Sequence, residues 1–313
     1  MTNFMSELNL RAARILRDCI ARSTELHIDF ETSGTSTIVD FGVATRGGLE
    51  AGRQLAEVCM AGLGTVSLQS DGGTPTVVVR TDHPVAACLQ SQYAGWKISS
   101  DDYFAMGSGP MRATLSREQI FLEMPIHEDA SECVGVLETG ALPSAAVLAD
   151  LQQQLGGERA FMLAVAPTAS QAGNIQVVAR SVETALHKLH EIDFPIETIQ
   201  SGCGSVPLPP VAKDDLAGIG RTNDAILYGG VVHLWVDCDD ETIEQFGPLT
   251  PSSASASHGE KFLTLFKQAG YDFYGLDKSL FSPAVVTFHN VTTGHSHTWG
   301  STHPDLVRDS FGL

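Results

Sequence analysis

Hydrophobic positions follow helical spacing in the first part of the chain and then form short apolar runs. Residues 5–22 repeat apolar side chains at intervals of three and four, which predicts an amphipathic opening helix. An apolar, β-branched run at 38–43 predicts a strand, and a double glycine then leads into a helical pattern over 49–62. This order of strand, glycine loop and helix is typical of α/β proteins.

A second unit of this kind lies further along the chain. The apolar run 161–166 predicts a strand, and a turn-rich loop separates it from a long helix over 175–190. The predicted fold class is therefore α/β, with an N-terminal domain over 1–155 and a C-terminal domain over 156–313. We expect the last 30 or so residues to pack back on the first domain.

The C-terminal part of the chain mixes polar and β-branched segments. The stretch 250–257 is rich in Ser, Thr and Pro, which predicts an exposed or mobile loop, and a helix is expected over 258–269. The run 284–288 reads as a strand followed by a turn at Thr293-Gly294.

Composition excludes several classes of protein. The 313 residues contain 19 Lys and Arg against 37 Asp and Glu, a net charge of −18, so a basic surface for nucleic acid is not expected. No run approaches the roughly 20 apolar residues of a membrane-spanning helix, and acidic side chains at Glu7 and Asp18 argue against a signal peptide. We expect a cytoplasmic protein with reduced cysteines.

One predicted helix carries a candidate for acid–base chemistry. Arg180 and Glu183 stand one turn apart, with two histidines further along the same face. An exposed, salt-bridged helix face is the simple interpretation. The alternative interpretation is that Glu183 lies beside Arg180 in a site shielded from water, where its carboxylate would act as a general base.

Metal and thiol chemistry find little support in the sequence. The six cysteines show none of the two-residue gaps typical of zinc or redox motifs, and Cys203 would be a nucleophile only with a base from elsewhere. Two of the histidines, on the helix over 175–190, have neither a third ligand nor the His-Glu-x-x-His order, and the C-terminal histidines lack a Cys or acidic partner at ligand spacing, so we predict no metal. The histidines considered are His187, His190, His289, His295, His297 and His303.

Three segments carry polar side chains that suit a flat, heterocyclic ligand. Glycines in 107–112 would let the backbone approach a ligand, and 82–96 combines amide, hydroxyl and aromatic groups for stacking. An Asn-Asp pair within 218–230 can hydrogen-bond the edge of a heterocycle. The competing interpretations are a tight turn, a core helix and a helix cap, respectively. The candidate binding residues are Ser91, Gln92, Tyr93, Ser108, Arg112, Asn223 and Asp224.

Four segments, taken in order, resemble the methenyltetrahydromethanopterin cyclohydrolases. They are VDFGVATRGGLEAGRQLAEVCMAGLG, TDHPVAACLQSQYAGWKI, YFAMGSGPMRA and GRTNDAILYGG. The opening helix, the segment VGVLE, the helix over 180–188 and the ending SFGL extend the resemblance over essentially the whole chain.

The resemblance implies two α/β domains enclosing a cleft, assembled as a homotrimer that needs no metal or cofactor. It implies reversible hydrolysis of the methenyl bridge of 5,10-methenyl-tetrahydromethanopterin to the 5-formyl form. The family's catalytic Arg and Glu match Arg180 and Glu183, so Glu183 would activate water and Arg180 would hold the carboxylate. Asn223 and Asp224 would bind the pterin together with residues 91–93. The pair Ser108 and Arg112 would bind the polar tail or a phosphate.

The resemblance places the protein in one-carbon metabolism. The protein's surplus of acidic residues is modest for its length and does not indicate adaptation to extreme salt. This favours formaldehyde oxidation in a methylotrophic bacterium over methanogenesis. Two other functions stay open: a pterin-binding or phosphate-ligand-binding protein without turnover, and a cyclohydrolase acting on the folate analogue.

Overall fold

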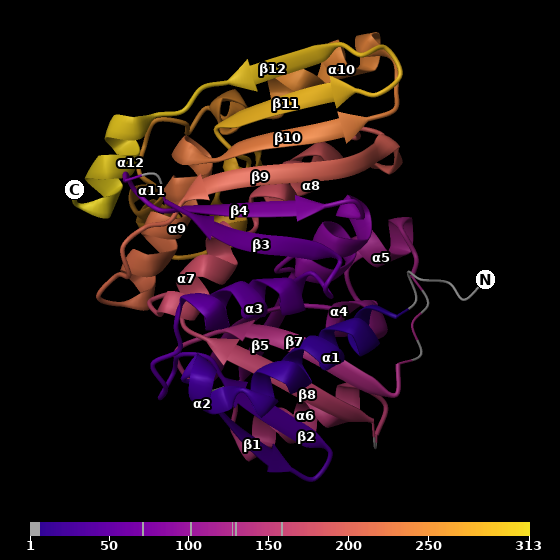
Figure 1. The fold of residues 1–313 in the computed structure, drawn as a ribbon, viewed down its shortest axis with the longest axis vertical. Coiled ribbons are helices and arrows are strands. Elements are labelled where there is room, and N and C mark those ends of the chain that lie inside the picture. The colour runs from indigo at the N-terminus through magenta and orange to yellow at the C-terminus, as the bar shows by residue number, and fades with distance from the viewer. Residues whose placement is uncertain (1–6, 71, 101, 127, 129, 158) are drawn as a thin grey trace. The chain divides into compact units, whose positions relative to one another are not determined.

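The chain forms two compact units, each built around a six-stranded sheet (Figure 1). The computed structural model describes residues 7–313 except 71, 101, 127, 129 and 158. Unit 1 consists of the described residues of Met1–Gly64 and Ala86–Gln176, and unit 2 of those of Thr65–Val85 and Val177–Leu313. Two α/β units confirm the predicted fold class. The boundary predicted after residue 155 lies within unit 1, and the 30 C-terminal residues belong to unit 2.

The sheet of unit 1 has the strand order β1-β2-β8-β7-β6-β5. Its central pairs, β2 with β8 and β8 with β7, are parallel, whereas the outer pairs are antiparallel. The strands are β1 (Asp29–Ser33), β2 (Ser36–Asp40), β5 (Trp96–Ser100), β6 (Tyr103–Ser108), β7 (Glu132–Glu138) and β8 (Ala160–Ala166). The parallel centre is buried on both faces, as expected when helices cover both sides.

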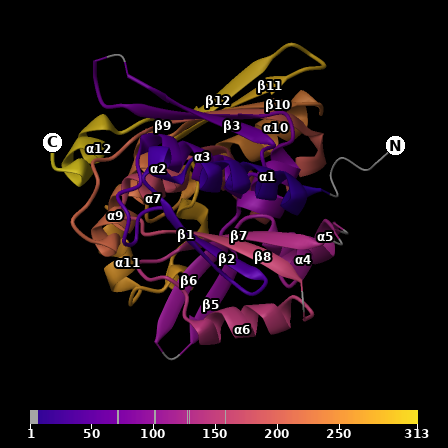
Figure 2. The same ribbon diagram turned by 60° about the horizontal axis from the view of Figure 1, so that its bottom comes forward.

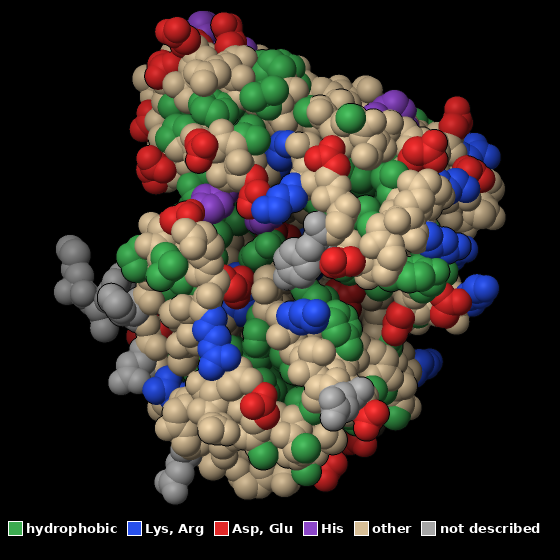
Figure 3. Space-filling view, turned by 180° about the vertical axis from the view of Figure 1, so that it is seen from behind, with side chains coloured by type: hydrophobic (Ala, Val, Ile, Leu, Met, Phe, Trp, Pro, Cys, Tyr) green, Lys and Arg blue, Asp and Glu red, His purple; other side chains and the backbone are tan. Residues whose placement is uncertain are grey.

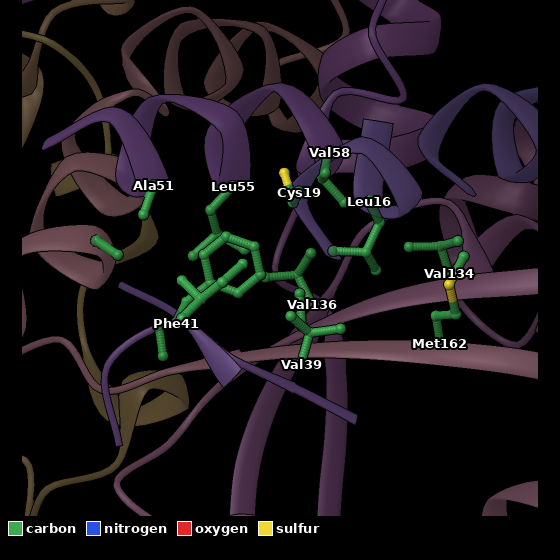
Figure 4. Close-up of a cluster of buried hydrophobic side chains, with 14 of the residues drawn as sticks. Leu16, Cys19, Val39, Phe41, Ala51, Leu55, Val58, Val134, Val136 and Met162 are labelled. Atoms are coloured by element: carbon green, nitrogen blue, oxygen red, sulfur yellow. The ribbon is translucent and has the colours of Figure 1, made fainter. Parts of the chain in front are cut away.

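Helices cover both faces of this sheet (Figure 2). The helices of this part of the chain are α1 (Leu8–Ala21), α2 (Ser23–Leu26), α3 (Leu49–Cys59), the π-helix η2 (Val85–Gln92), α4 (Met111–Leu115), α5 (Gln119–Glu123), α6 (Ala145–Gln154) and α7 (Gln171–Val178); η2 begins and α7 ends in unit 2. On one face, Leu16 of α1 and Leu55 of α3 meet Val39, Phe41 and other apolar side chains of the sheet region in one core (Figure 4). On the other face, α6 packs Val147 and Leu151 against the sheet.

The sheet of unit 2 has the strand order β12-β11-β10-β9-β4-β3 (Figure 1). Only β10 and β11 are parallel among the pairs whose register is defined; β12 with β11, β10 with β9 and β9 with β4 are antiparallel. The strands are β3 (Gly64–Gln69), β4 (Thr76–Thr81), β9 (Ile199–Pro207), β10 (Val231–Val236), β11 (Val285–Asn290) and β12 (Ser296–Gly300). The segment 65–85 thus joins the later strands through β4 and β9.

Helices cover one face of the unit 2 sheet. They are α8 (Ser181–Glu191), η3 (Ile196–Thr198), α9 (Asp215–Gly229), α10 (Asp240–Phe246), η4 (Gly247–Leu249), η5 (Ser252–Ala254), α11 (Phe262–Gln268), η6 (Phe273–Gly275), η7 (Lys278–Leu280) and α12 (Pro304–Phe311). On β10, Val232 and Leu234 are buried beneath them, whereas the intervening His233 and Trp235 lie on the more open face. In the part of the chain that the structure describes, no helix is long and apolar enough to cross a bilayer.

Two predicted elements differ from the structure. The helix expected over 175–190 is wrong as a single element, because α7 ends at Val178 and α8 begins at Ser181 after a turn. The loop expected to be exposed over 250–257 is partly buried, since Thr250 and Ser252 are fully buried and the Ser252 hydroxyl donates to the Leu227 carbonyl (2.5 Å).

Other elements agree with the sequence more closely. The opening helix is confirmed from Leu8 to Ala21, and residues 5 and 6 of the prediction lie outside the described residues. The helix expected over 258–269 is present in a shorter form, as α11 begins only at Phe262.

Candidate active site

The first turn of α8 holds the two residues predicted to be catalytic. Arg180 is the N-cap residue, and its backbone (φ −87°, ψ 9°) departs from helical values, which separates α8 from α7. The Arg180 carbonyl starts the new helix by accepting bonds from the Thr184 amide (2.8 Å) and the Thr184 hydroxyl (2.7 Å). Glu183 lies in the same turn. The turn therefore fixes a guanidinium and a carboxylate within one winding of helix.

The α8 turn rests directly on the backbone of β9. A Cβ atom added at Gly202 would lie 2.7 Å from Cγ1 of Val182, and one added at Gly204 would overlap the Ser181 hydroxyl. These two glycines therefore remove the side chains that would otherwise hold the helix away from the strand. The glycine-rich segment around Cys203 is thus explained by packing.

Cys203 lies between these glycines and belongs to the other face of β9. Its side chain is partly exposed there. Burial raises the pKa of the Cys203 thiol, which reduces the thiolate that a nucleophile needs. The structure gives no support to a nucleophilic role.

Arg180 and Glu183 are almost completely buried, with 6% and 4% of their surface exposed. The interpretation of an exposed, salt-bridged face is therefore wrong for these two residues. Charged side chains are rarely this buried in proteins unless an opposite charge or hydrogen bonds compensate for the lost hydration. Glu183 also occupies the end of α8 where the helix dipole favours a negative charge. A buried carboxylate with an arginine on the same turn can hold a water molecule and accept its proton.

The histidines of this helix contribute less. His187 and His190 are half-buried, and Nε2 of His187 lies 3.9 Å from Oε1 of Glu191. That contact lies toward the C-terminal end of α8, away from the turn that holds Arg180 and Glu183.

The predicted binding residues of unit 1 come together around a buried arginine. Arg112 is fully buried, and it donates to both carboxylate oxygens of Glu118 (2.8 and 2.6 Å). It also donates to the carbonyls of Leu89 (3.2 Å) and Ser91 (3.1 Å), and its guanidinium lies 5.1 Å from the Tyr93 ring centre. Four of its N–H donors are thereby used inside unit 1.

The hydroxyls of this group are also directed inward. The Ser91 hydroxyl donates to the Cys59 carbonyl (2.5 Å), and the Ser108 hydroxyl lies 3.6 Å from the Cys59 sulfur. Gln92 is fully buried at the end of the π-helix η2. These contacts explain the cluster as part of the unit 1 core, and a contact with a pterin or its tail stays a prediction for these residues.

Asn223 and Asp224 lie in the middle of α9, so the interpretation as a cap is wrong; Asp214 caps this helix by accepting from the Ala217 amide (2.8 Å). Asn223 donates to the Ile219 carbonyl (2.9 Å). Asp224 accepts from the Phe262 amide (2.8 Å) and the Ser310 hydroxyl (2.6 Å).

Asp224 thus ties the beginning of α11 and the end of α12 to α9. Burial raises the pKa of this carboxyl group to about 6. A pterin contact stays a prediction for both Asn223 and Asp224.

One cluster with the chemistry of a metal site was not predicted from the sequence. Asp240, His295 and His297 each offer a ligand atom, and these atoms lie within 4.8 Å of one another. An acidic partner for the C-terminal histidines therefore exists, but it is 55 residues away from His295 in the sequence. Two signals were available: the His-x-His spacing at the start of a strand, and the acidic run at the start of a helix.

Known proteins of one family match this chain over nearly its whole length. The family model described as Cyclohydrolase (MCH) matches residues 7–311. A methenyltetrahydromethanopterin cyclohydrolase of Rhodopirellula baltica is 45% identical over 292 residues, which cover 90% of this chain and 88% of the relative. Proteins of the same name from Methylobacillus flagellatus (43% over 297 residues, 93% and 90% coverage) and Methanococcoides burtonii (36% over 317 residues, 99% and 99%) are similar. The chain therefore belongs to the methenyltetrahydromethanopterin cyclohydrolase family.

Proposed function

We propose that the protein reversibly hydrolyses 5,10-methenyl-tetrahydromethanopterin to 5-formyl-tetrahydromethanopterin. The activity named for its relatives supports this proposal, because they match nearly the whole chain. The observation that carries the mechanism is the buried pair of Arg180 and Glu183 on the first turn of α8.

The reaction suits a carboxylate and a guanidinium. The methenyl carbon bonded to two nitrogens is a cation, so it is already electrophilic and needs chiefly a positioned water. Glu183 takes a proton from that water while its oxygen bonds to the carbon. The carbon–nitrogen bond to the arylamine then breaks as the hydroxyl on that carbon becomes the formyl carbonyl. Glu183 returns its proton to the departing nitrogen, and the hydroxyl proton is released to solvent. The cationic substrate and one water thus give the neutral formyl product and one proton, with no electron transfer and no cofactor.

Arg180 acts on the carboxylate rather than on the carbon in this proposal. A guanidinium presents several N–H donors in a fixed plane, which suits it to hold a carboxylate in one orientation. The ionised carboxylate is the form that accepts a proton, and Arg180 would keep it directed at the water.

We further propose a homotrimer in the cytoplasm with a role in formaldehyde oxidation. The described cysteines form no disulfide, as is typical of a reducing compartment. The open face of the unit 2 sheet carries Trp235, which is 37% exposed and stacks on His289, and exposed aromatic surface of this kind supports contact between subunits. Light scattering should give three times 33.4 kDa, and a monomer mass would contradict the trimer.

The activity is tested by following the ultraviolet absorbance of methenyl-tetrahydromethanopterin with purified protein and no added metal or nucleotide. We expect loss of the methenyl absorbance well above the spontaneous rate, and a much slower reaction with the folate analogue. Saturable binding without loss of absorbance would identify a binding protein instead. Faster turnover of the folate analogue would assign the enzyme to that substrate.

A further inference from the structure

The cluster of Asp240, His295 and His297 lies in unit 2, apart from the elements that carry Arg180 and Glu183. Asp240 begins α10, whereas His295 directly precedes β12 and His297 lies within it. In Figure 1, α10 and the turn between β11 and β12 lie at the same end of the unit 2 sheet. Acidic side chains gather at this end in the space-filling view, with histidine among them (Figure 3).

The three side chains point their ligand atoms at one another. Nδ1 of His295 lies 2.6 Å from Oδ2 of Asp240, and Nε2 of His297 lies 3.5 Å from Oδ1 of Asp240. The atoms are within 4.8 Å of one another. A tetrahedral ion with metal–ligand bonds of about 2.0–2.1 Å separates its ligands by about 3.3 Å, so small side-chain movements would complete the geometry.

His297 presents an enclosed ligand atom to this cluster. Its Nε2 atom is buried on a side chain that is 20% exposed, and it lies 3.5 Å from Oδ1 of Asp240 without making a hydrogen bond with any described residue. A buried polar atom normally has a partner, because leaving it without one is costly. The position of this nitrogen beside a carboxylate suits a metal ion as that partner.

Outer contacts hold the carboxylate in place. Oδ1 of Asp240 accepts from the Asn290 side-chain amide (2.7 Å) and from the Thr293 hydroxyl (3.0 Å). The side-chain oxygen of Asn290 accepts in turn from the backbone amides of Thr292 and Thr293, and these bonds fix the turn between β11 and β12. Hydrogen bonds of this kind orient metal ligands in known sites.

We propose that Asp240, His295 and His297 bind one divalent transition-metal ion, with Zn²⁺ as the representative, which fastens α10 to the edge strand β12. Two imidazoles and one carboxylate are a ligand set that suits such ions and leaves a position for water. Mg²⁺ is disfavoured because it prefers an all-oxygen set. The three ligands lie on α10 and at β12, outside the α8 turn, so the ion adds no step to the proposed hydrolysis.

The test is calorimetric titration of the tag-free, metal-stripped full-length protein with Zn²⁺, and with Mg²⁺ for comparison. We expect one Zn²⁺ per chain, a higher melting temperature with zinc, and no binding of Mg²⁺. Loss of an outer contact alone weakens metal sites by about 10–100-fold, so His297→Asn or His295→Asn should weaken zinc binding by more than about 100-fold. Both variants should retain hydrolysis, because neither residue belongs to the α8 turn.

Two histidine variants serve as matched controls. His233→Asn removes one member of the His233–His289 pair on the neighbouring strands, and His27→Asn removes an exposed histidine of unit 1. Both should bind zinc as the unaltered protein does. Absence of zinc binding, unchanged binding in His297→Asn and His295→Asn, or loss of binding in His233→Asn would each overturn the proposal. Asp240→Asn is a weaker test, because it also removes the acceptor on which the β11–β12 turn is built.

Discussion

Gly204→Ala tests the claim that β9 positions the catalytic turn. A Cβ atom at this position would overlap the Ser181 hydroxyl and lie 3.1 Å from the Ser181 Cβ and 3.2 Å from Cγ2 of Val182. Both neighbours are fully buried in the first turn of α8, so they have little room to yield. The added methyl group should therefore push the turn, and with it Arg180 and Glu183, away from the strand.

Overpacking of this kind costs about 1–3 kcal/mol of stability. Displacement of a catalytic group by about 1 Å can lower the rate by about 100-fold. We expect Gly204→Ala to lower the free energy of unfolding by about 1–3 kcal/mol and kcat by about 10–100-fold. Urea denaturation and the methenyl absorbance assay measure these two quantities.

Ser181→Ala provides the matched control. The Ser181 hydroxyl is buried and has no hydrogen-bond partner among the described residues, so its removal should be neutral or slightly stabilising. In the double variant Ser181→Ala/Gly204→Ala the severe overlap is gone, and the tight contacts that remain are those at 3.1 and 3.2 Å. The double variant should recover most of the lost stability and rate.

Two results would refute this reasoning. Gly204→Ala could match the unaltered protein in both stability and kcat, which would show that α8 does not depend on the glycine. The double variant could also be no better than the single one, which would place the damage somewhere other than the contact with Ser181.

Three further predictions follow from the buried charges. Burial raises the pKa of Asp224 from 3.8 to about 6, so the folded state binds this proton more tightly than the unfolded state does. Stability should therefore fall by up to about 3 kcal/mol as the pH rises from about 4 through 6, and Asp224→Asn should remove this part of the pH dependence of urea denaturation. Arg112→Met should lower the free energy of unfolding by about 3–5 kcal/mol, because it leaves the Glu118 carboxylate without its partner, and Arg112→Met/Glu118→Gln should recover part of the loss. An unchanged midpoint of urea denaturation in Arg112→Met would contradict the stabilising role of this pair. Arg180→Lys keeps the charge but loses the planar donors, so kcat should fall by on the order of tenfold, and an unchanged kcat would exclude the holding role.

The sequence predicted correctly those elements that depend on the spacing of apolar residues close together in the chain. The opening helix and the strand at 160–166 follow their apolar periodicity, and the pair of Arg180 and Glu183 was found on one helix turn. The break between α7 and α8 was missed, because neither glycine nor proline marks residues 179–180 and the apolar spacing continues across them.

Features that depend on tertiary contacts could not be read from the sequence. Ser252 looked like an exposed loop residue by composition, but its hydroxyl is satisfied by the Leu227 carbonyl and can therefore be buried. Gly204 is explained only by the helix that packs on it. Asp240 meets His295 across 55 residues, and only the pairing of β11 with β12 beside α10 brings them together.

The central claim is that Glu183 moves the proton during hydrolysis. The most direct test compares Glu183→Gln with the unaltered protein in single-turnover loss of methenyl absorbance, alongside binding of the same substrate. General-base catalysis contributes about 100–10,000-fold, so we predict a loss in this range with little change in substrate affinity and an intact fold by circular dichroism. A Glu183→Gln variant that binds the pterin and hydrolyses it at the original rate would contradict the account.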